Sequence, residues 1–196
     1  MLHKIKELQK KRNMRKTIFA FALLAMLAAC NQSSKPTQPV ETESEAAVAE
    51  EAADTIDTET RQENMQEVQA YLKECGVFYI ATTDGDQPRV RPFGVSEIIN
   101  GQLYIMTGKM KDVYKQMAAN GKFEICALKS SGAEWLRLSG TLVADETLAV
   151  KEEFLERNPS LKAMYKADDD NMAVLYVTKA TARFCSFTEA ERKVNF

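Results

Sequence analysis

Two lysines beside a glycine are among the residues of this 196-residue chain best suited to bind a ligand. Lys109 and Lys111 follow Gly108 where a predicted strand runs into a predicted helix. Free backbone N–H groups at a helix start attract anions, and the positive end of the helix dipole normally favours acids there. Lysines in that turn therefore predict a phosphate bound beside them. Two solvated lysines on a surface turn are the alternative.

A second basic motif lies one hairpin earlier, in the predicted strand from Arg89 to Val95. Strand alternation places Arg89, Arg91 and Phe93 on one face. A guanidinium that shares a face with apolar side chains is suited to a fixed anion, which it binds through two parallel hydrogen bonds. The alternative is an arginine that extends into solvent from an edge strand, which Pro92 would mark.

A third motif pairs the only tryptophan of the chain with an arginine. Leu136 and Leu138 are expected to face the core, which turns Trp135 and Arg137 outward together. An exposed tryptophan beside an arginine is typical of an interface or of a site for a ring-shaped ligand. Simple stacking at the surface is the alternative.

Histidine is the informative absence, because His3 is the only one in the chain. A domain without histidine excludes Ser-His-Asp and Cys-His triads and argues against a transition-metal site. Any chemistry is therefore expected to come from a bound cofactor, and no catalytic side chain is assigned. Cys75, Cys126 and Cys185 have no C-x-x-C spacing and are predicted to be buried, inert thiols, with a redox role as the alternative.

The first residues of the chain predict export. A basic start and a short apolar run from Thr17 to Ala29 are typical of a secretory signal, so residues 1–29 are expected to be a signal peptide. The sequence Leu27-Ala28-Ala29-Cys30 resembles a bacterial lipobox, which implies lipidation of Cys30; a chance cysteine after an ordinary signal is the alternative. Acyl chains on Cys30 would anchor the protein to a membrane of the cell envelope, with its domain outside the cytoplasm.

Composition divides the remaining chain into a tether and a domain. Residues 31–60 hold eight acids and one lysine with few large apolar side chains, so residues 30–60 are expected to be a disordered acidic tether. Residues 61–196 carry 18 basic and 19 acidic side chains, and this balance argues against a nucleic-acid partner. Their number is typical of one domain.

Hydrophobic periodicity predicts the elements that must position the three motifs. Helices are expected from the capping box at Thr60 to Cys75, from Gly108 to Asn120 and, interrupted near Pro159, from Glu146 to Tyr165. Strands are expected at residues 77–83, 89–99, 102–107, 122–128, 134–144, 172–178 and 181–187. Short reversals without βαβ alternation predict a mainly β domain with flanking α-helices, an antiparallel barrel with the helices packed outside.

In this order the motifs resemble the pyridoxamine 5'-phosphate oxidase-like superfamily of FMN-binding split barrels, in the short form typical of general-stress-type members. The resemblance covers roughly residues 66–187 and implies that Arg91, which follows the Gln87-Pro88 turn, binds the FMN phosphate. It also implies a homodimer with two sites at its interface. The other residues that it implies at the flavin are Tyr104, Thr107, Lys109 and Lys111, together with Trp135 and Arg137 from the other subunit.

The chain also departs from relatives of this kind. The pyridoxamine 5'-phosphate oxidases proper have a histidine in a C-terminal substrate segment, and residues 191–196 have none, so vitamin B6 oxidation is not expected. The related nitroimidazole reductases and haem-handling members also rely on a histidine that is missing. We therefore expect a lipid-anchored flavoprotein oxidoreductase with an unassigned substrate. The alternative is a non-catalytic envelope module that holds flavin, haem or another anionic ligand.

Overall fold

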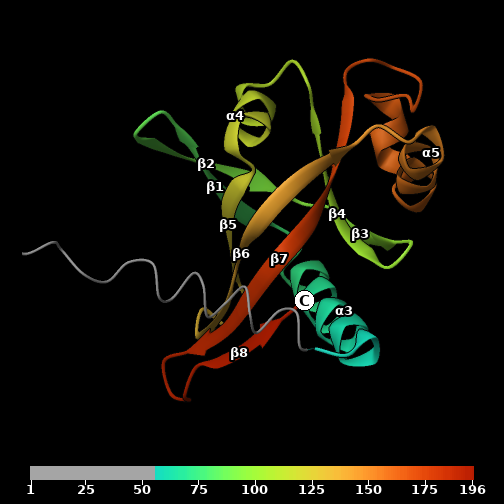
Figure 1. The fold of residues 1–196 in the computed structure, drawn as a ribbon. Helices are drawn as coiled ribbons and strands as arrows, with labels where there is room; N and C mark the ends of the chain where they lie inside the picture. The colour runs from blue at the N-terminus through green and yellow to red at the C-terminus, as the bar shows by residue number, and fades with distance from the viewer. Residues whose placement is uncertain (1–55) are drawn as a thin grey trace, which may run out of the picture. The chain divides into compact units, whose positions relative to one another are not determined.

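The computed structural model of this protein describes residues 56–196, which form an eight-stranded antiparallel sheet with helices outside it (Figure 1). The strands are β1 (Phe78–Asp84), β2 (Gln87–Phe93), β3 (Ser96–Ile99), β4 (Gln102–Gly108), β5 (Lys122–Leu128), β6 (Glu134–Asp145), β7 (Met172–Ser186) and β8 (Arg192–Asn195). The helices are α3 (Thr58–Cys75), α4 (Asp112–Asn120), α5 (Leu148–Arg157) and the short 3-10 helix η1 (Pro159–Ala163). The predicted mainly β architecture with flanking helices is confirmed.

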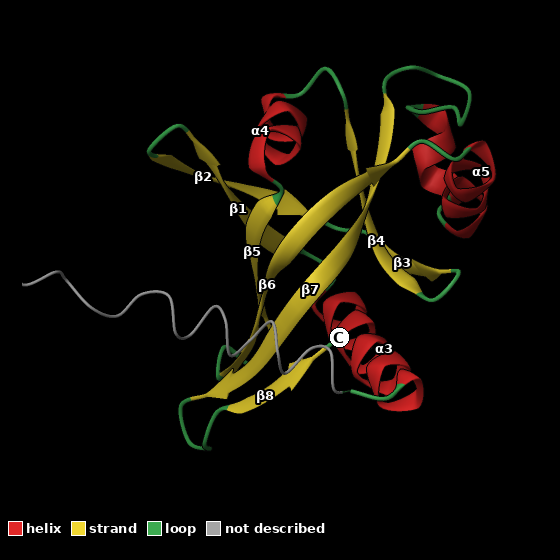
Figure 2. Cartoon of the chain, viewed as in Figure 1, coloured by secondary structure: helices red, strands yellow, loops and turns green. Residues whose placement is uncertain are grey.

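The long strand β7 joins two parts of the sheet. The strand order is β2-β1-β5-β6-β7-β4-β3, and β8 pairs with β7 outside this path. One edge of β7 pairs with β6, whereas its other edge pairs first with β4 and then with β8. Figure 2 shows β1, β2 and β5 on one side of the β6–β7 pair and β3 and β4 on the other. The two ends of β7 therefore support different parts of the barrel.

The β6–β7 pair bends where its register shifts between Ser139 and Thr141. A Cβ atom on Gly140 would lie only 2.8 Å from the Thr178 carbonyl oxygen, so glycine is needed for this approach. Two strands were predicted for β7, with a break near Lys179. The backbone is indeed distorted there, with a φ of 51° at Lys179, but pairing with β6 continues on both sides and keeps β7 one strand.

Other element boundaries also differ from the prediction. The expected strand over residues 89–99 is two strands, because β2 pairs with β1 while β3 pairs with β4 in another part of the sheet. Helix α3 begins at Thr58, where the Asp57 carboxylate caps it by accepting from the Thr60 N–H at 2.9 Å. Thr60 donates its hydroxyl to the same carboxylate, so the cap lies three residues before the predicted one. Strand β8 was not predicted, because its four residues include only one apolar side chain and so show no alternation. Its pairing with β7 defines it as a strand.

The three cysteines of the described residues have different environments, which corrects the expectation that all are buried. Cys185 is buried and Cys75 is partly buried, but Cys126 is exposed. On β5 the inward positions belong to Phe123 and Ile125, so alternation turns Cys126 to the outer face. Only Cys185 fits the predicted burial in full.

Strand β4 is buried on both of its faces and separates two apolar clusters. Leu103 and Ile105 belong to the larger cluster, which packs beneath α3 and inside the sheet. Tyr104 and Met106 belong to the smaller cluster, with residues of α5 such as Phe154. Each fully buried large apolar side chain stabilises the fold by about 1.5–3 kcal/mol. The end of β4, which leads into the basic turn, is thereby held from both sides.

A buried carboxylate fixes the junction of α5 and η1. Glu97 of β3 is 5% exposed and accepts hydrogen bonds from Lys73 Nζ at 3.1 Å and Gln69 Nε2 at 3.3 Å, both on α3. It also accepts from Asn158 Nδ2 at 3.3 Å, at the point where α5 ends and η1 begins. One acidic side chain therefore links α3, β3 and the start of η1.

Candidate ligand-binding site

A cavity of about 780 Å³ lies among β2, the end of β4, the start of α4 and η1. Its lining has two chemically different parts, which we name by their residues. The basic wall consists of Arg89, Arg91 and Lys111, with the acids Asp84 and Asp112 beside it, and the apolar wall consists of Val95, Met106, Leu161, Met164 and Tyr165. Arg89 forms an ion pair with Asp84 at 3.2 Å, so Arg91 and Lys111 are the unpaired cations of this wall among residues 56–196. A cavity of this size with one polar and one apolar wall is typical of a site for a cofactor-sized amphiphilic ligand.

Arg91 is held by neutral oxygen atoms. Its Nη1 donates to Thr82 Oγ1 at 2.6 Å and its Nη2 donates to Gln116 Oε1. Thr82 Oγ1 donates in turn to Gln116 Oε1 at 2.8 Å, and both partners are buried. Neutral acceptors orient the guanidinium without cancelling its charge. Since no carboxylate within residues 56–196 forms an ion pair with Arg91, the cavity receives a positive charge in a defined position.

Lys111 adds a second positive charge at the start of α4. It is the N-cap residue of this helix, with an extended backbone, and no side chain caps the helix start. In the described part of the chain Lys111 has no ion-pair partner either. The pKa of Asp112, in the first turn, is lowered mainly by a hydrogen bond from Lys115, and the charges of Arg91 and Arg89 lower it further. The uncapped helix start and the Lys111 charge favour an anion beside this turn, where Asp112 already lies.

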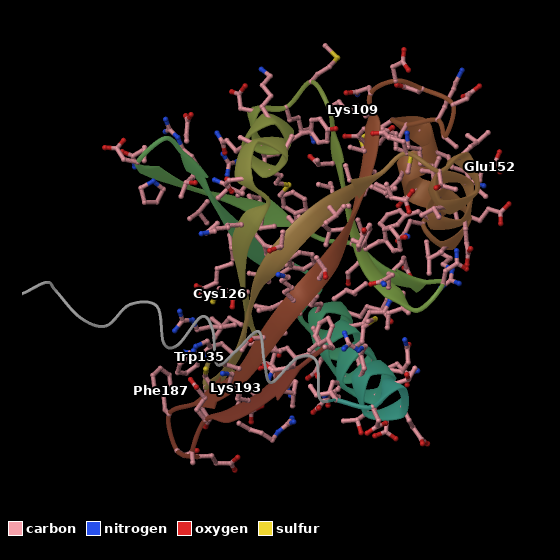
Figure 3. All side chains as sticks on the ribbon, in the orientation of Figure 1. Lys109, Cys126, Trp135, Glu152, Phe187 and Lys193 are labelled. Atoms are coloured by element: carbon pink, nitrogen blue, oxygen red, sulfur yellow. The ribbon has the colours of Figure 1, made fainter. Side chains whose placement is uncertain are left out.

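Lys109 belongs to a different cluster and does not line the cavity. Its Nζ donates to Glu146 Oε2 at 2.8 Å, and the buried Lys151 donates to the same oxygen at 2.8 Å. The hydrogen bond from Lys109, followed by that from Lys151, lowers the pKa of Glu146. Within this chain the structure therefore pairs Lys109 with an acid, where the resemblance implies a phosphate. Figure 3 shows Lys109 beside the turn before α4.

Tyr104 and Thr107, which the resemblance implies at the same flavin, lie in different surroundings. The Tyr104 hydroxyl donates to Asp145 Oδ2 at 2.8 Å, and burial, with this bond second, raises the pKa of the phenol well above its usual range. Tyr104 does not line the cavity, whereas the buried Thr107 does. Of the sequence-predicted contacts, the structure brings together Arg91, Thr107 and Lys111.

Trp135 and Arg137 face outward, as the strand pattern predicted, and neither lines the cavity. Figure 3 shows Trp135 near Phe187. Arg137 Nε donates to Glu124 Oε1 at 2.6 Å, and the rings of Trp135 and Phe187 lie 5.1 Å apart. These side chains share the outer face of the sheet with a row of residues that are paired from β1 to β8. That row contains Tyr79, Cys126, Arg137, Arg183 and Lys193.

Sequence reasoning missed the residues that hold Arg91 and those that form the apolar wall. Thr82 and Gln116 are polar residues at inward positions of β1 and α4, and that position was the available signal. For Leu161, Met164 and Tyr165 the sequence indicated only an interrupted helix. Nothing local relates that helix to β2, which lies about 70 residues earlier in the chain.

Within residues 56–196, no helix has both the length and the apolar composition needed to cross a membrane. No group of three or more His, Cys, Asp or Glu side chains in the same range is arranged to hold a metal ion.

Sequence comparison identifies two segments. Residues 65–186 match the family model described as Pyridoxamine 5'-phosphate oxidase. Residues 14–31, outside the described structure, match the model of a prokaryotic membrane lipoprotein lipid attachment site, and Cys30 lies within this match. No curated protein matches the chain.

Several solved structures share the fold. A NimC/NimA family protein from Clostridium acetobutylicum is 44% identical, with a TM-score of 0.69 over 71% of this chain and 96% of its own. General Stress Protein 26 from Bacillus anthracis is 14% identical, with a TM-score of 0.54 over 66% of this chain and 98% of its own. A Clostridium acetobutylicum protein related to general stress protein 26 is 13% identical, with a TM-score of 0.54, covering 71% and 96%. The predicted split barrel is confirmed.

The ion pairs of Glu146 predict a pH-dependent loss of stability. Replacing Glu146 with Gln leaves the buried Lys151 without its carboxylate, and because the Glu146 side chain is half exposed we expect a loss of about 1–2 kcal/mol at pH 7. The folded pKa of Glu146 lies below its ordinary value of 4.5, so its contribution is present above that pH and is lost as the pH falls through the folded pKa. Urea unfolding of both proteins at pH 7 and at a pH below the folded pKa of Glu146 measures this difference in the free energy of unfolding.

Glu152→Gln is the matched control, since it removes an exposed carboxylate from α5, the helix that carries Lys151 (Figure 3). It should change the free energy of unfolding by less than about 0.5 kcal/mol both at pH 7 and at the lower pH. Equal stability of Glu146→Gln and wild type at pH 7 would show that the Lys109–Glu146–Lys151 cluster contributes nothing.

Proposed function

Because the chain belongs to the pyridoxamine 5'-phosphate oxidase family, we propose that its cavity binds FMN, with the phosphate at the basic wall and the ring system against the apolar wall. The observation that carries this proposal is the sorting of charges. Arg91 and Lys111 line the cavity and form no ion pair within residues 56–196, whereas Lys109 and Arg137 pair with acids elsewhere. A phosphate dianion is the partner that suits two such cations.

The other residues of the cavity also fit FMN. The start of α4 supplies a positive dipole end beside Lys111, which favours a phosphate. Met106, Leu161 and Tyr165 supply apolar and aromatic surface against which a flat ring system can pack. The volume of about 780 Å³ lies within the range of cofactor sites, which is roughly 300–1,000 Å³.

The proposed activity is an oxidoreductase with an unassigned substrate. FMN, when bound, supplies electron transfer. The protein residues bind and orient it: Thr82 and Gln116 keep the Arg91 guanidinium aimed at the phosphate. The apolar wall excludes water from the ring. A protein that binds FMN but transfers no electrons would instead be the non-catalytic binding module.

The outer face of the sheet is proposed as the interface of a homodimer. Tyr79, Leu128 and Phe187 are 51%, 52% and 78% exposed on or beside this face, which is an unusual accumulation of large apolar side chains. Val90 of β2 pairs with Ala81 on the same face and also lines the cavity. A partner that covers this face would therefore reach the cavity mouth, where its Trp135 and Arg137 would meet the flavin, as the resemblance implies.

The proposal also includes a lipid anchor at Cys30. The match to a lipoprotein lipid attachment site supports it, and Cys30 is the only cysteine within that match. Acylation at this residue would hold the flavin domain on an envelope membrane, outside the cytoplasm.

Flavin binding is tested by removing the charges of the basic wall. The full-length protein, purified in detergent, should be yellow and bind FMN. Arg91→Ala and Lys111→Ala should each weaken FMN binding by about ten- to a hundredfold, because each removes a charged hydrogen bond to the phosphate. Fluorescence titration measures the affinity. Lys109→Ala is the comparison, and it should bind FMN within about threefold of wild type, since Lys109 pairs with Glu146.

Colourless wild-type protein that takes up no FMN contradicts the proposal. Equal losses of FMN affinity in Lys109→Ala and Lys111→Ala would instead support the contact between Lys109 and the phosphate that the resemblance implies.

The dimer is tested with two matched leucines. Leu128 and Leu148 are 52% and 49% exposed, but only Leu128 lies on the outer face. Leu128→Glu buries a carboxylate in the proposed interface and should raise the dimer dissociation constant at least about a hundredfold. Leu148→Glu, on α5, should leave it unchanged. Sedimentation velocity measures both, and a Leu128→Glu protein that remains as dimeric as wild type argues against this interface.

The anchor is tested in cells of a bacterium that processes lipoproteins. Wild-type protein should incorporate radiolabelled palmitate supplied to the cells, and Cys30→Ser should incorporate none because no acyl chain can be attached. Cys126→Ser, which changes an exposed cysteine of the folded domain, should still be labelled. Equal labelling of Cys30→Ser and wild type would contradict lipidation at Cys30.

A further inference from the structure

The turn between β4 and α4 is held by Asn171, a residue that does not line the cavity. The Lys109 N–H donates to the Asn171 backbone oxygen at 2.7 Å, and the Met110 N–H donates to Asn171 Oδ1 at 3.1 Å. Two consecutive N–H groups of the turn are therefore bound by one residue that lies 61 positions later in the chain. The second of these bonds depends on the asparagine side chain.

Gly108 lets the turn approach Asn171 closely. A Cβ atom at this position would lie 3.1 Å from Asn171 Oδ1 and 3.3 Å from the Tyr165 hydroxyl, which is tighter than ordinary contacts. Gly108 is not among the residues with positive φ, so the glycine is required by space. Any side chain here would push against the amide that holds Met110.

Asn171 is itself fixed to the rest of the fold. Its N–H donates to Asp169 Oδ1, and the next residue, Met172, pairs with Gly108 in the β4–β7 ladder. On the other side of the turn, the Lys111 N–H donates to the Gly108 oxygen at 3.0 Å. The turn is thus held at both ends, by the bonds of Asn171 to Lys109 and Met110 at the start of β7 and by the bond of Gly108 to Lys111 at the start of α4.

We infer that Asn171 is a positioning residue for anion binding: its side chain, seated against Gly108, sets Lys111 and the start of α4 in the geometry that holds a phosphate. This inference rests on the proposed binding of FMN and deepens it. Displacing the amide moves the turn that carries Lys111, while Val95, Leu161 and Met164 of the apolar wall lie on other segments.

The experiment compares FMN with riboflavin, which is the same flavin without the phosphate. In Asn171→Ala, FMN affinity should fall about five- to twentyfold through the lost hydrogen bond, and riboflavin affinity should stay within about twofold. A general loss of folding would weaken both ligands together. The preference for FMN over riboflavin therefore reports on the phosphate part of the site alone.

Asn120→Ala is the matched control. Asn120 lies at the other end of α4 and makes two comparable bonds, donating to Thr83 Oγ1 at 3.0 Å and accepting from the Lys122 N–H at 2.9 Å. Its replacement should lower thermal stability to a similar extent. It should leave the preference for FMN over riboflavin unchanged.

Gly108→Ala tests the contact between the two residues. Alone, it should reduce the preference for FMN about as much as Asn171→Ala does. In the double variant the contacts with the Asn171 amide are gone and only the Tyr165 hydroxyl, 3.3 Å away, still meets the new Cβ, so the loss of preference should be clearly smaller than the product of the two single losses.

The outcomes separate the two proposals. Wild-type protein that binds FMN, with the same preference over riboflavin in Asn171→Ala, overturns the positioning role and leaves the proposed function intact. Multiplying losses in the double variant also overturn it, because the residues would then act independently. Wild-type protein that binds no FMN overturns the proposed function, and the positioning role is lost with it.

Discussion

The burial of β4 on both faces is the constraint from which the geometry of the cavity follows. Leu103 and Ile105 pack into one apolar cluster while Tyr104 and Met106 pack into the other. A strand held in this way cannot shift its register without exposing one whole set of side chains. The position of its last residue, Gly108, is therefore fixed, and this in turn fixes where α4 begins. A packed core thus sets the position of a polar site at its edge.

The distribution of charge around this turn shows how one short segment serves two purposes. Lys109 and Lys111 are two residues apart, yet Lys109 pairs with Glu146 and Lys111 is left to the cavity. The first lysine contributes to the contact between the turn and the start of α5. The second retains the charge that a ligand can use. Arg91 belongs with Lys111 in this respect, since neutral oxygens hold it in place.

Much of the fold could be predicted from the sequence, because strand alternation and helical spacing depend on neighbouring residues. The outward direction of Trp135 and the hairpin at Asn100-Gly101 are examples, and the structure has both. The site was less predictable, because its partners are distant in the chain: Glu146 lies 37 positions from Lys109, and Asn171 lies 61 from Met110. Local patterns identify a cation, but only the fold decides whether an acid neutralises it. The division of residues 89–99 into two strands likewise depends on which strands each half pairs with.

Strand β2 ends the sheet, and its two prolines have a consequence for how copies of the protein can associate. Pro88 and Pro92 lack N–H groups, so the free edge of β2 offers an incomplete set of donors to another strand. Another strand therefore finds only an incomplete template there for edge-to-edge association. The same edge borders the cavity, since Arg89, Arg91 and Pro92 line it. One strand thus both limits edge-to-edge pairing and supplies part of the cavity lining.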